Sequence, residues 1–148
     1  MVILFLTGNL MTLAQSADLT TVDHKYVDKN GYPVTGEFQV QIDDQTDMDL
    51  TLSNGDISGL AASYYPDGNV KEYGNFLDGN RVGDWSLFNQ SGERIIEASY
   101  LKGEKHGIWY IWDANGNLRC KMKFRHGVKV GIWKFWDENG KLLMKKSY

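Results

Sequence analysis

The chain has 148 residues, of which 42% are hydrophobic and 24% are charged. This composition excludes an intrinsically disordered chain and is typical of one folded domain with its own core. A single cysteine excludes an intramolecular disulfide and a thiolate metal cluster, whereas 16 glycines and 13% aromatic residues favour strands joined by tight turns.

The net charge of −3 conceals an uneven distribution along the chain. Residues 1–99 contain 5 Lys/Arg and 15 Asp/Glu, whereas residues 100–148 contain 11 Lys/Arg and 4 Asp/Glu. Drift among the solvated positions of a repeat explains such a difference. It also suits a basic end that meets an anionic partner or phospholipid headgroups, or head-to-tail self-association.

The first 15 residues have the apolar run of a signal peptide. The chain opens with MVILFL, stays largely apolar to Ala14 and becomes polar from Ser16 onward. This run is too short to span a bilayer, and no basic residue precedes it. We expect a signal peptide over residues 1–15 and a protein exported to the periplasm or the cell exterior. Without such a peptide the protein would be cytoplasmic.

Residues 16–54 are predicted to form a degenerate β unit that caps the rest of the chain. Residues 26–40 (YVDKNGYPVTGEFQV) resemble one unit of the repeat described below, with the glycines shifted. The acidic residues between Asp43 and Asp49 are expected to form a solvated loop. Terminal units of an array are atypical because they cover an exposed sheet edge.

Residues 55–148 contain four copies of a 24-residue repeat. Several independent columns of glycine and aromatic residues share this one spacing, which indicates a tandem array. The columns are Gly55, Gly79, Gly103, Gly127; Gly59, Gly83, Gly107, Gly131; Gly68, Gly92, Gly116, Gly140; Trp85, Trp109, Trp133; Tyr64, Phe88, Trp112, Trp136; and Phe76, Tyr100, Phe124, Tyr148.

Each unit is predicted to be a β-hairpin. In the third unit the run GIWYIW (107–112) has the aromatic and β-branched composition of a strand. Residues 113–116 suit a type I turn that ends in a left-handed glycine, and residues 118–124 alternate between apolar and basic side chains. We therefore predict an all-β protein in which tandem 24-residue hairpins form one elongated, twisted antiparallel meander sheet.

The pattern F-x-x-G-x-x-x-G-x-W-x-x-[WF]-x-x-x-G-x-L, present from Phe124 to Leu142, resembles the MORN-repeat variant. This tandem hairpin repeat occurs in many bacterial proteins labelled as antitoxin components of toxin–antitoxin pairs. The resemblance covers residues 55–148 well and residues 26–54 poorly. It implies an extended sheet that serves as an interaction scaffold, and it brings no catalytic residues. The stretch WDANGNL (112–118) also resembles the tyrosine–aspartate repeat of polymorphic-toxin shells.

The sequence contains no constellation typical of catalysis or of a bound cofactor. The three histidines lack zinc-site spacing, no glycine-rich stretch has phosphate-loop form, and no nucleophile elbow is present. Cys120 shares its repeat position with Ile96 and Met144, which indicates a small buried hydrophobe. We expect no enzymatic activity, no metal and no cofactor.

A partner is expected to bind one face of the sheet. Strand residues three apart point to opposite faces, so Trp109 and Trp112 should lie on opposite sides. We assign the column of Trp109 to the core and the column of Trp112 to an accessible groove. The alternative is that strand curvature and dimerisation bury both columns. The candidate partner-binding residues are Tyr64, Phe88, Tyr110, Trp112, Lys134 and Trp136.

These features predict a non-enzymatic interaction scaffold that binds a protein partner, in the manner of an antitoxin or immunity protein. The alternative is a module of the cell envelope that binds anionic lipid or glycan, with aromatic rings for sugar faces and a basic end for headgroups. Aromatics interleaved with lysines also occur in nucleic-acid grooves. We expect no nucleic acid partner, because the aromatic columns are required for packing.

Overall fold

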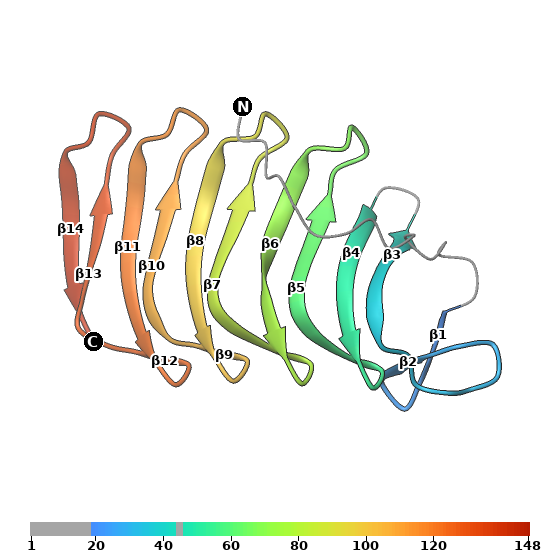
Figure 1. The fold of residues 1–148 in the computed structure, drawn as a ribbon. Coiled ribbons are helices and arrows are strands. Elements are labelled where there is room, and N and C mark those ends of the chain that lie inside the picture. The colour runs from blue at the N-terminus through green and yellow to red at the C-terminus, as the bar shows by residue number, and fades with distance from the viewer. Residues whose placement is uncertain (1–18, 44–45) are drawn as a thin grey trace.

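The computed structural model describes residues 19–43 and 46–148 (Figure 1). The expected signal peptide at residues 1–15 lies outside the described residues. The described residues form strands and no helix. They therefore contain no helix that is long and apolar enough to cross a membrane. The strands are β1 (Thr20–Val22), β2 (Lys25–Val27), β3 (Gly36–Asp43), β4 (Thr46–Ser53), β5 (Asp56–Tyr64), β6 (Val70–Leu77), β7 (Asn80–Phe88), β8 (Arg94–Leu101), β9 (Glu104–Lys105), β10 (Gly107–Trp112), β11 (Leu118–Arg125), β12 (Val128–Lys129), β13 (Ile132–Trp136) and β14 (Leu142–Ser147).

The predicted antiparallel meander is confirmed. One sheet runs in the order β14-β13-β11-β10-β8-β7-β6-β5-β4-β3, with the short strands β12 and β9 paired to β11 and β8. Consecutive strands are neighbours throughout, and every pairing is antiparallel. The sheet is therefore an open row of hairpins with two distinct ends (Figure 1).

Two kinds of turn alternate along this row. At one edge, tight two-residue turns have both residues at positive φ, as in Lys102 (51°) and Gly103 (81°), which is the type I′ geometry that matches the twist of a hairpin. At the other edge, longer loops are held by an aspartate or asparagine side chain. Asp113 Oδ1 accepts hydrogen bonds from the backbone N–H groups of Asn115 and Asn117, each at 3.0 Å, and in the second unit Asn89 Oδ1 accepts one from the backbone N–H of Glu93 at 2.9 Å. Both turn types recur with the period of the sequence.

Beside each longer loop the return strand carries one extra residue. In the third unit Ile111 pairs with Cys120 and Trp112 pairs with Leu118, so Arg119 is a β-bulge. Lys71, Ile95 and Leu143 are the corresponding extra residues. A bulge bends its strand and increases the local twist, so each hairpin curves at the same height (Figure 1).

The main core is a continuous rib of seven aromatic rings on one face of the sheet. Residues from two of the sequence columns alternate along it, with centroid separations from 4.6 to 6.3 Å. Trp85, Trp109 and Trp133 are 4%, 8% and 6% exposed, which confirms the predicted core column. In chain order the rib consists of Phe76, Trp85, Tyr100, Trp109, Phe124, Trp133 and Tyr148.

Beside three successive tight turns, a cationic side chain lies over this rib. Arg81 lies 3.9 Å from the Trp85 ring centroid, and Lys105 and Lys129 lie over their own units' tryptophans. These three cations are 24 residues apart. Their aliphatic stems shield the rings while their charges remain near water, which lets a single-layer sheet bury its tryptophans.

A second cluster closes the N-terminal end of the core. Leu50 and Leu52 are 2% and 1% exposed, and Leu19, Tyr26 and Val34 pack against the same cluster. The β1–β2 hairpin and the loop after it thus cover this end. The acidic residues expected in a loop are placed differently: Asp43 ends β3, Asp47 and Asp49 lie within β4, and Asp44 falls outside the described residues.

Candidate functional site

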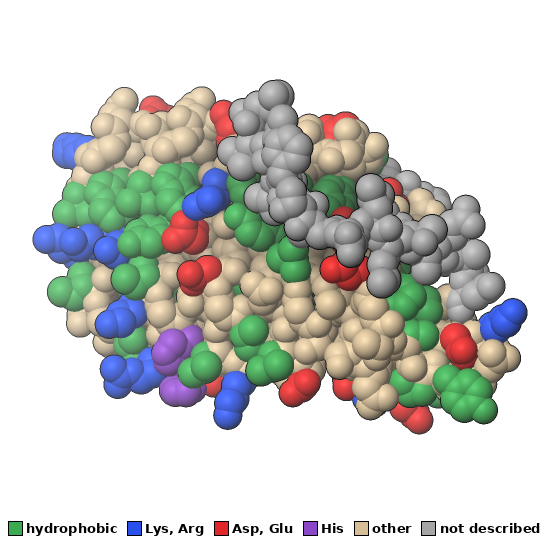
Figure 2. Space-filling view, viewed as in Figure 1, with side chains coloured by type: hydrophobic (Ala, Val, Ile, Leu, Met, Phe, Trp, Pro, Cys, Tyr) green, Lys and Arg blue, Asp and Glu red, His purple; other side chains and the backbone are tan. Residues whose placement is uncertain are grey.

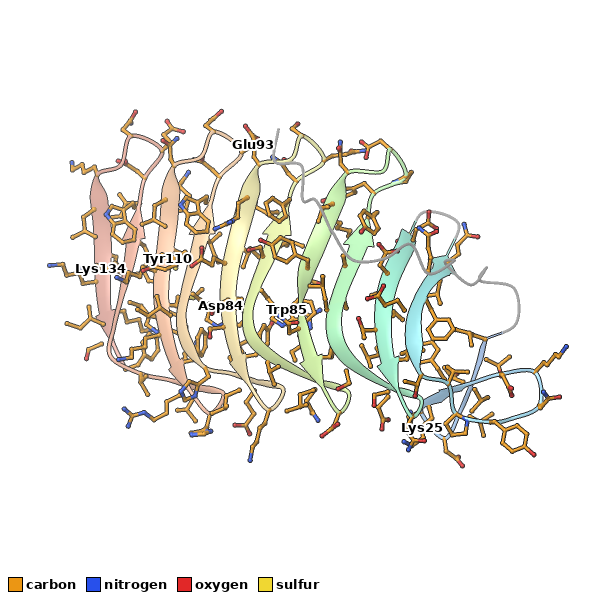
Figure 3. All side chains as sticks on the ribbon, viewed as in Figure 1. Lys25, Asp84, Trp85, Glu93, Tyr110 and Lys134 are labelled. Atoms are coloured by element: carbon orange, nitrogen blue, oxygen red, sulfur yellow. The ribbon has the colours of Figure 1, made fainter. Side chains whose placement is uncertain are left out.

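The two faces of the sheet differ in chemistry. The core face carries the aromatic rib. The outer face is the opposite side, on which Tyr110, Lys121 and Lys134 lie; Tyr110 pairs with Lys121, and Lys121 pairs with Lys134. Asp84 and Trp85, which are adjacent in the chain, show the alternation between the faces (Figure 3). All sequence-predicted binding residues prove to lie on the outer face.

An aromatic band crosses the half of the outer face that lies nearer the longer loops. Trp112 stacks on Tyr110 with centroids 5.6 Å apart and planes 29° apart, and Phe88 stacks on Tyr73 at 5.7 Å and 20°. All members are partly exposed. Side chains of this type present large, rigid contact areas at protein interfaces. The band consists of Tyr64, Tyr73, Phe88, Tyr110, Trp112 and Trp136.

Tyr64 ends the band on the acidic side of the molecule. Its hydroxyl donates a 2.6 Å hydrogen bond to Oδ2 of Asp49 on the neighbouring strand. Burial raises the pKa of the Tyr64 phenol, and the Asp49 carboxylate raises that pKa further because it accepts the hydrogen bond of the hydroxyl and carries a negative charge. Tyr64 therefore remains a neutral hydrogen-bond donor over the physiological pH range.

A row of lysines crosses the middle of the outer face at the C-terminal end of the sheet. Lys121 pairs with Lys134, and Lys134 pairs with Lys145, so three ammonium-bearing side chains lie directly opposite one another on β11, β13 and β14. No described acidic residue forms an ion pair with any of them. Like charges in this position destabilise a sheet, so the row leaves an anion-attracting surface.

On the preceding strand, β8, the charged side chains of the outer face neutralise one another. Glu97 is the partner of Tyr110 on β8, and it forms a 2.8 Å ion pair with Arg94. The Arg94 guanidinium in turn lies 5.8 Å from the centroid of Phe88 in the aromatic band. The charge on this face thus changes from neutralised pairs on β8 to uncompensated lysines on β11–β14. Figure 2 shows the hydrophobic band over the C-terminal strands, with basic side chains directly beside it.

The half of the outer face nearer the tight turns carries an aliphatic column. Leu60, Ile108 and Ile132 occupy the same repeat position, and Asp84 takes that position in the second unit. Leu60, Ile108 and Ile132 are 38%, 39% and 59% exposed. Polar residues of the return strands separate the members of this column: Leu60 pairs with Asn75, Ile108 with Lys123 and Ile132 with Ser147. The apolar surface beside the lysine row is therefore the aromatic band.

The structure brings together more residues than sequence analysis identified. Tyr110 and Lys134 occupy the same repeat position and lie at the same height on the face (Figure 3). Sequence analysis missed Lys121, Lys145 and the aliphatic column. A usable signal existed for that column, since its members are 24 residues apart. The lysine row had no such signal, because Lys134 occupies a different repeat position from Lys121 and Lys145.

The described residues provide little for catalysis. No group of three or more His, Cys, Asp or Glu side chains among them could hold a metal ion. His106 and His126 are adjacent, with centroids 5.0 Å apart, and Glu104 is the nearby acid, 3.3 Å from His126. Cys120 is buried, and burial raises the pKa of its thiol, which lowers its nucleophilicity at neutral pH.

Comparison with known proteins agrees with this architecture. Three segments of the chain, residues 58–78, 105–126 and 129–148, match the MORN repeat variant. No curated protein matches the chain. The matched segments coincide with β5–β6, with β9–β11 and with the strands from β13 to the end, so the repeat that sequence analysis recognised accounts for these hairpins.

Proposed function

We propose that this protein is a non-enzymatic interaction scaffold whose outer face binds a protein partner. The observation that carries the proposal is the lysine row beside the aromatic band, on a face that the aromatic rib does not use. MORN repeats are commonly binding modules, which supports a scaffold rather than an enzyme. Large rings provide contact area, and the uncompensated charges select a partner.

The test is a double substitution, Trp112→Ser with Trp136→Ser, which removes the two largest rings of the aromatic band. In-cell crosslinking followed by mass spectrometry should recover a partner with the wild type and lose it with this variant. Circular dichroism must show that the variant keeps its sheet, because these rings lie outside the rib. The matched control is Val22→Ser with Tyr32→Ser, two exposed residues of the N-terminal hairpin and the loop after it, outside the main sheet.

Two results would remove the proposal. One is a crosslinked partner that persists in the Trp112/Trp136 variant but is lost in the control. The other is loss of the folded sheet in the Trp112/Trp136 variant at temperatures where the control stays folded. That result would show that both aromatic columns hold the fold together.

A narrower form of this function is that of an antitoxin or immunity protein, which inhibits its partner by covering it. The resemblance to repeats in antitoxin-labelled proteins supports this form. Co-expression tests it: the chain should rescue growth of cells that carry a toxic reading frame encoded beside its own gene, and the Trp112/Trp136 variant should not. An adjacent frame that is harmless to cells would contradict the antitoxin role and leave the scaffold proposal standing.

The second candidate is a lipid- or glycan-binding module at the cell envelope. The observation that favours it is the closeness of lysines to stacked rings: Lys121 lies 5.4 Å from the Tyr110 centroid, and Tyr110 stacks on Trp112. Vesicles with anionic headgroups and vesicles of neutral phosphatidylcholine separate charge from apolar insertion. Binding to the anionic vesicles that is lost in Lys121→Gln/Lys134→Gln would favour lipid over protein.

A further inference from the structure

We infer that the partner segment bound by the outer face is an acidic amphipathic α-helix, lying across the C-terminal strands with its carboxylates over the lysine row. This inference rests on the proposed function, because it names the chemistry of the partner for the same surface. Three features of the C-terminal strands lead to it: the sign of their charge, the apolar residues beside the lysine row, and the spacing of both.

The charge on the C-terminal strands is exclusively basic. The strands β10, β11, β13 and β14 contain no aspartate or glutamate. Lys123, which pairs with Ile108 on the outer face, adds a fourth ammonium group beside the lysine row. A partner with carboxylates at this place supplies the countercharge that these strands lack, whereas a basic partner is repelled. Charge complementarity therefore selects an acidic partner.

An apolar strip lies beside the lysine row, on the side of the longer loops. It consists of two cross-strand pairs, Trp112 with Leu118 and Trp136 with Leu142. Leu142 is 39% exposed, and the other three are partly exposed. Arg119, the bulge residue beside the strip, forms a 3.3 Å ion pair with the loop aspartate of its own unit. The strip therefore calls for an apolar surface next to the acids of the partner.

The spacing of the lysines fits one stripe of an α-helix. Paired residues on adjacent antiparallel strands have Cα atoms about 4.5–5.5 Å apart, so the three lysines of the row span about 10 Å. Helix residues i, i+4 and i+7 follow one stripe and also extend over about 10 Å, because each residue rises about 1.5 Å. Three carboxylates in this pattern therefore meet Lys121, Lys134 and Lys145 one to one.

The apolar strip lies at the distance of the next stripe of such a helix. Trp136 is two residues from Lys134 on β13, and two strand residues extend about 6.8 Å. Neighbouring stripes on a helix of about 10 Å diameter are separated by a similar distance. A helix with an acidic stripe beside an apolar stripe therefore covers the lysine row and the apolar strip together.

Other acidic ligands match only part of this surface. In an extended segment lying across the strands, alternate side chains point away, so the segment turns a single file of residues, about 6.8 Å apart, toward the sheet. A linear anionic polymer follows the lysine row and leaves the rings of Trp112 and Trp136 uncovered. Only the helix presents acids and apolar side chains side by side at the spacing of these strands.

The experiment measures the binding of synthetic peptides to the full chain by fluorescence anisotropy. The helical probe has about 20 residues, with glutamates at i, i+4 and i+7 and a leucine one position after each glutamate. The broken probe has the same glutamates and leucines but contains two central prolines, which prevent the helix. The wild type should bind the helical probe at least about tenfold more tightly than the broken probe. Chemical shifts of the isotope-labelled helical probe should show that it is helical when bound.

Two variants of equal net charge locate the binding site. The row variant is Lys121→Gln/Lys134→Gln, which should stay folded because it relieves the repulsion between paired lysines. The control variant is Lys29→Gln/Lys102→Gln, whose lysines lie in turns away from the lysine row. The row variant should bind the helical probe at least about tenfold more weakly than the control variant.

Three results would overturn the inference. The first is equal affinity of the wild type for the helical and the broken probe, which would indicate an extended or unstructured anionic ligand. The second is equal weakening in the row and control variants, which would indicate a general attraction between opposite charges. The third is no binding of the helical probe to the wild type at about 500 μM protein.

These outcomes are separable from those of the proposed function. A partner that crosslinks to the wild type and not to the Trp112/Trp136 variant, but whose crosslinked segment contains no acidic helix, would refute the helix and retain the scaffold. A crosslinked segment that is a helix with acids at i, i+4 and i+7 would support both. A partner that persists in the Trp112/Trp136 variant and is lost in the Val22/Tyr32 control would remove the scaffold proposal and the helix with it.

Discussion

At the scale of single residues, the rib depends on how closely each tryptophan approaches the neighbouring strand. Gly74 faces Trp85, and its repeat counterparts are Ala98 and Met122. A Cβ atom on Gly74 would lie 2.2 Å from Cδ2 of Trp85. Gly74 is thus required for space, whereas Gly103 and its counterparts are required for positive φ.

We predict that Gly74→Ala lowers the free energy of unfolding by roughly 2–3 kcal/mol, because the added methyl group overpacks the rib. Urea denaturation measures this change. Trp85→Leu in the same chain should recover part of the loss, since the smaller side chain makes room. If Gly74→Ala lowered the free energy of unfolding equally in the wild type and in Trp85→Leu, a clash with the Trp85 ring would not explain the effect.

The tryptophans also differ in how their indole N–H groups are satisfied. Nε1 of Trp109 donates to the carbonyl of Ser99 at 3.0 Å, and Nε1 of Trp133 donates to that of Lys123 at 3.1 Å. Nε1 of Trp85 is buried and finds no acceptor among the described residues. A buried donor without an acceptor costs free energy, so the first rib tryptophan is the least favourable of the three.

We therefore predict that Trp109→Phe destabilises the protein by about 1 kcal/mol more than Trp85→Phe. Both substitutions remove a similar volume, but only the first breaks a hydrogen bond. Thermal unfolding of the two variants, with Trp133→Phe as a second case that should follow Trp109→Phe, provides the comparison. If Trp85→Phe were the most damaging of the three, the hydrogen bonds would not explain the difference.

At the scale of the structural element, the tight turns are the least optimised feature of the hairpins. Four of them share one geometry, but their first residues are Asn54, Asp78, Lys102 and His126, all at positive φ. Asparagine and aspartate adopt this conformation readily, whereas lysine does so with strain. The two later hairpins therefore store strain that the earlier two avoid.

We predict that Lys102→Asn raises the free energy of unfolding by roughly 0.5–1 kcal/mol. The opposite exchange, Asp78→Lys, should lower it by a similar amount. Equilibrium unfolding in guanidinium chloride measures both effects. No gain from Lys102→Asn, combined with a loss from Asp78→Lys, would point to contacts of the Asp78 side chain rather than to backbone strain.

At the scale of the whole molecule, cross-strand pairing converts a charge gradient along the sequence into a charged row on one face. Lys134 is flanked by a lysine on each side, so it experiences the strongest repulsion. We predict that Lys134→Gln stabilises the protein by roughly 0.5 kcal/mol at low salt. The gain should disappear near 1 M salt, where the screening length falls to about 3 Å.

The control for this prediction is Lys102→Gln, a turn lysine with no lysine opposite it, which should show no such salt dependence. Differential scanning calorimetry at two salt concentrations provides the measurement. A Lys134→Gln variant that is less stable than the wild type at low salt would indicate that the row is neutralised in the free protein.

The amino-acid sequence by itself determined the period, the hairpins, both kinds of turn and the burial of the Trp85, Trp109 and Trp133 column. These features follow from local chemistry: glycine permits positive φ, aspartate organises a loop, and alternation divides a strand into two faces. The same alternation placed the six candidate binding residues on one face. Their role in binding a partner stays a prediction.

Only the tertiary structure decided which residues from different repeat positions meet. The bulges and the two-residue turns set the register, and that register places Lys134 beside Lys121 and Lys145. It also interleaves the column of Phe124 with that of Trp133 in a single rib. A periodic sequence shows which positions are equivalent, but neighbouring strands bring non-equivalent positions together, so the charged row follows from pairing geometry and not from the repeat alone.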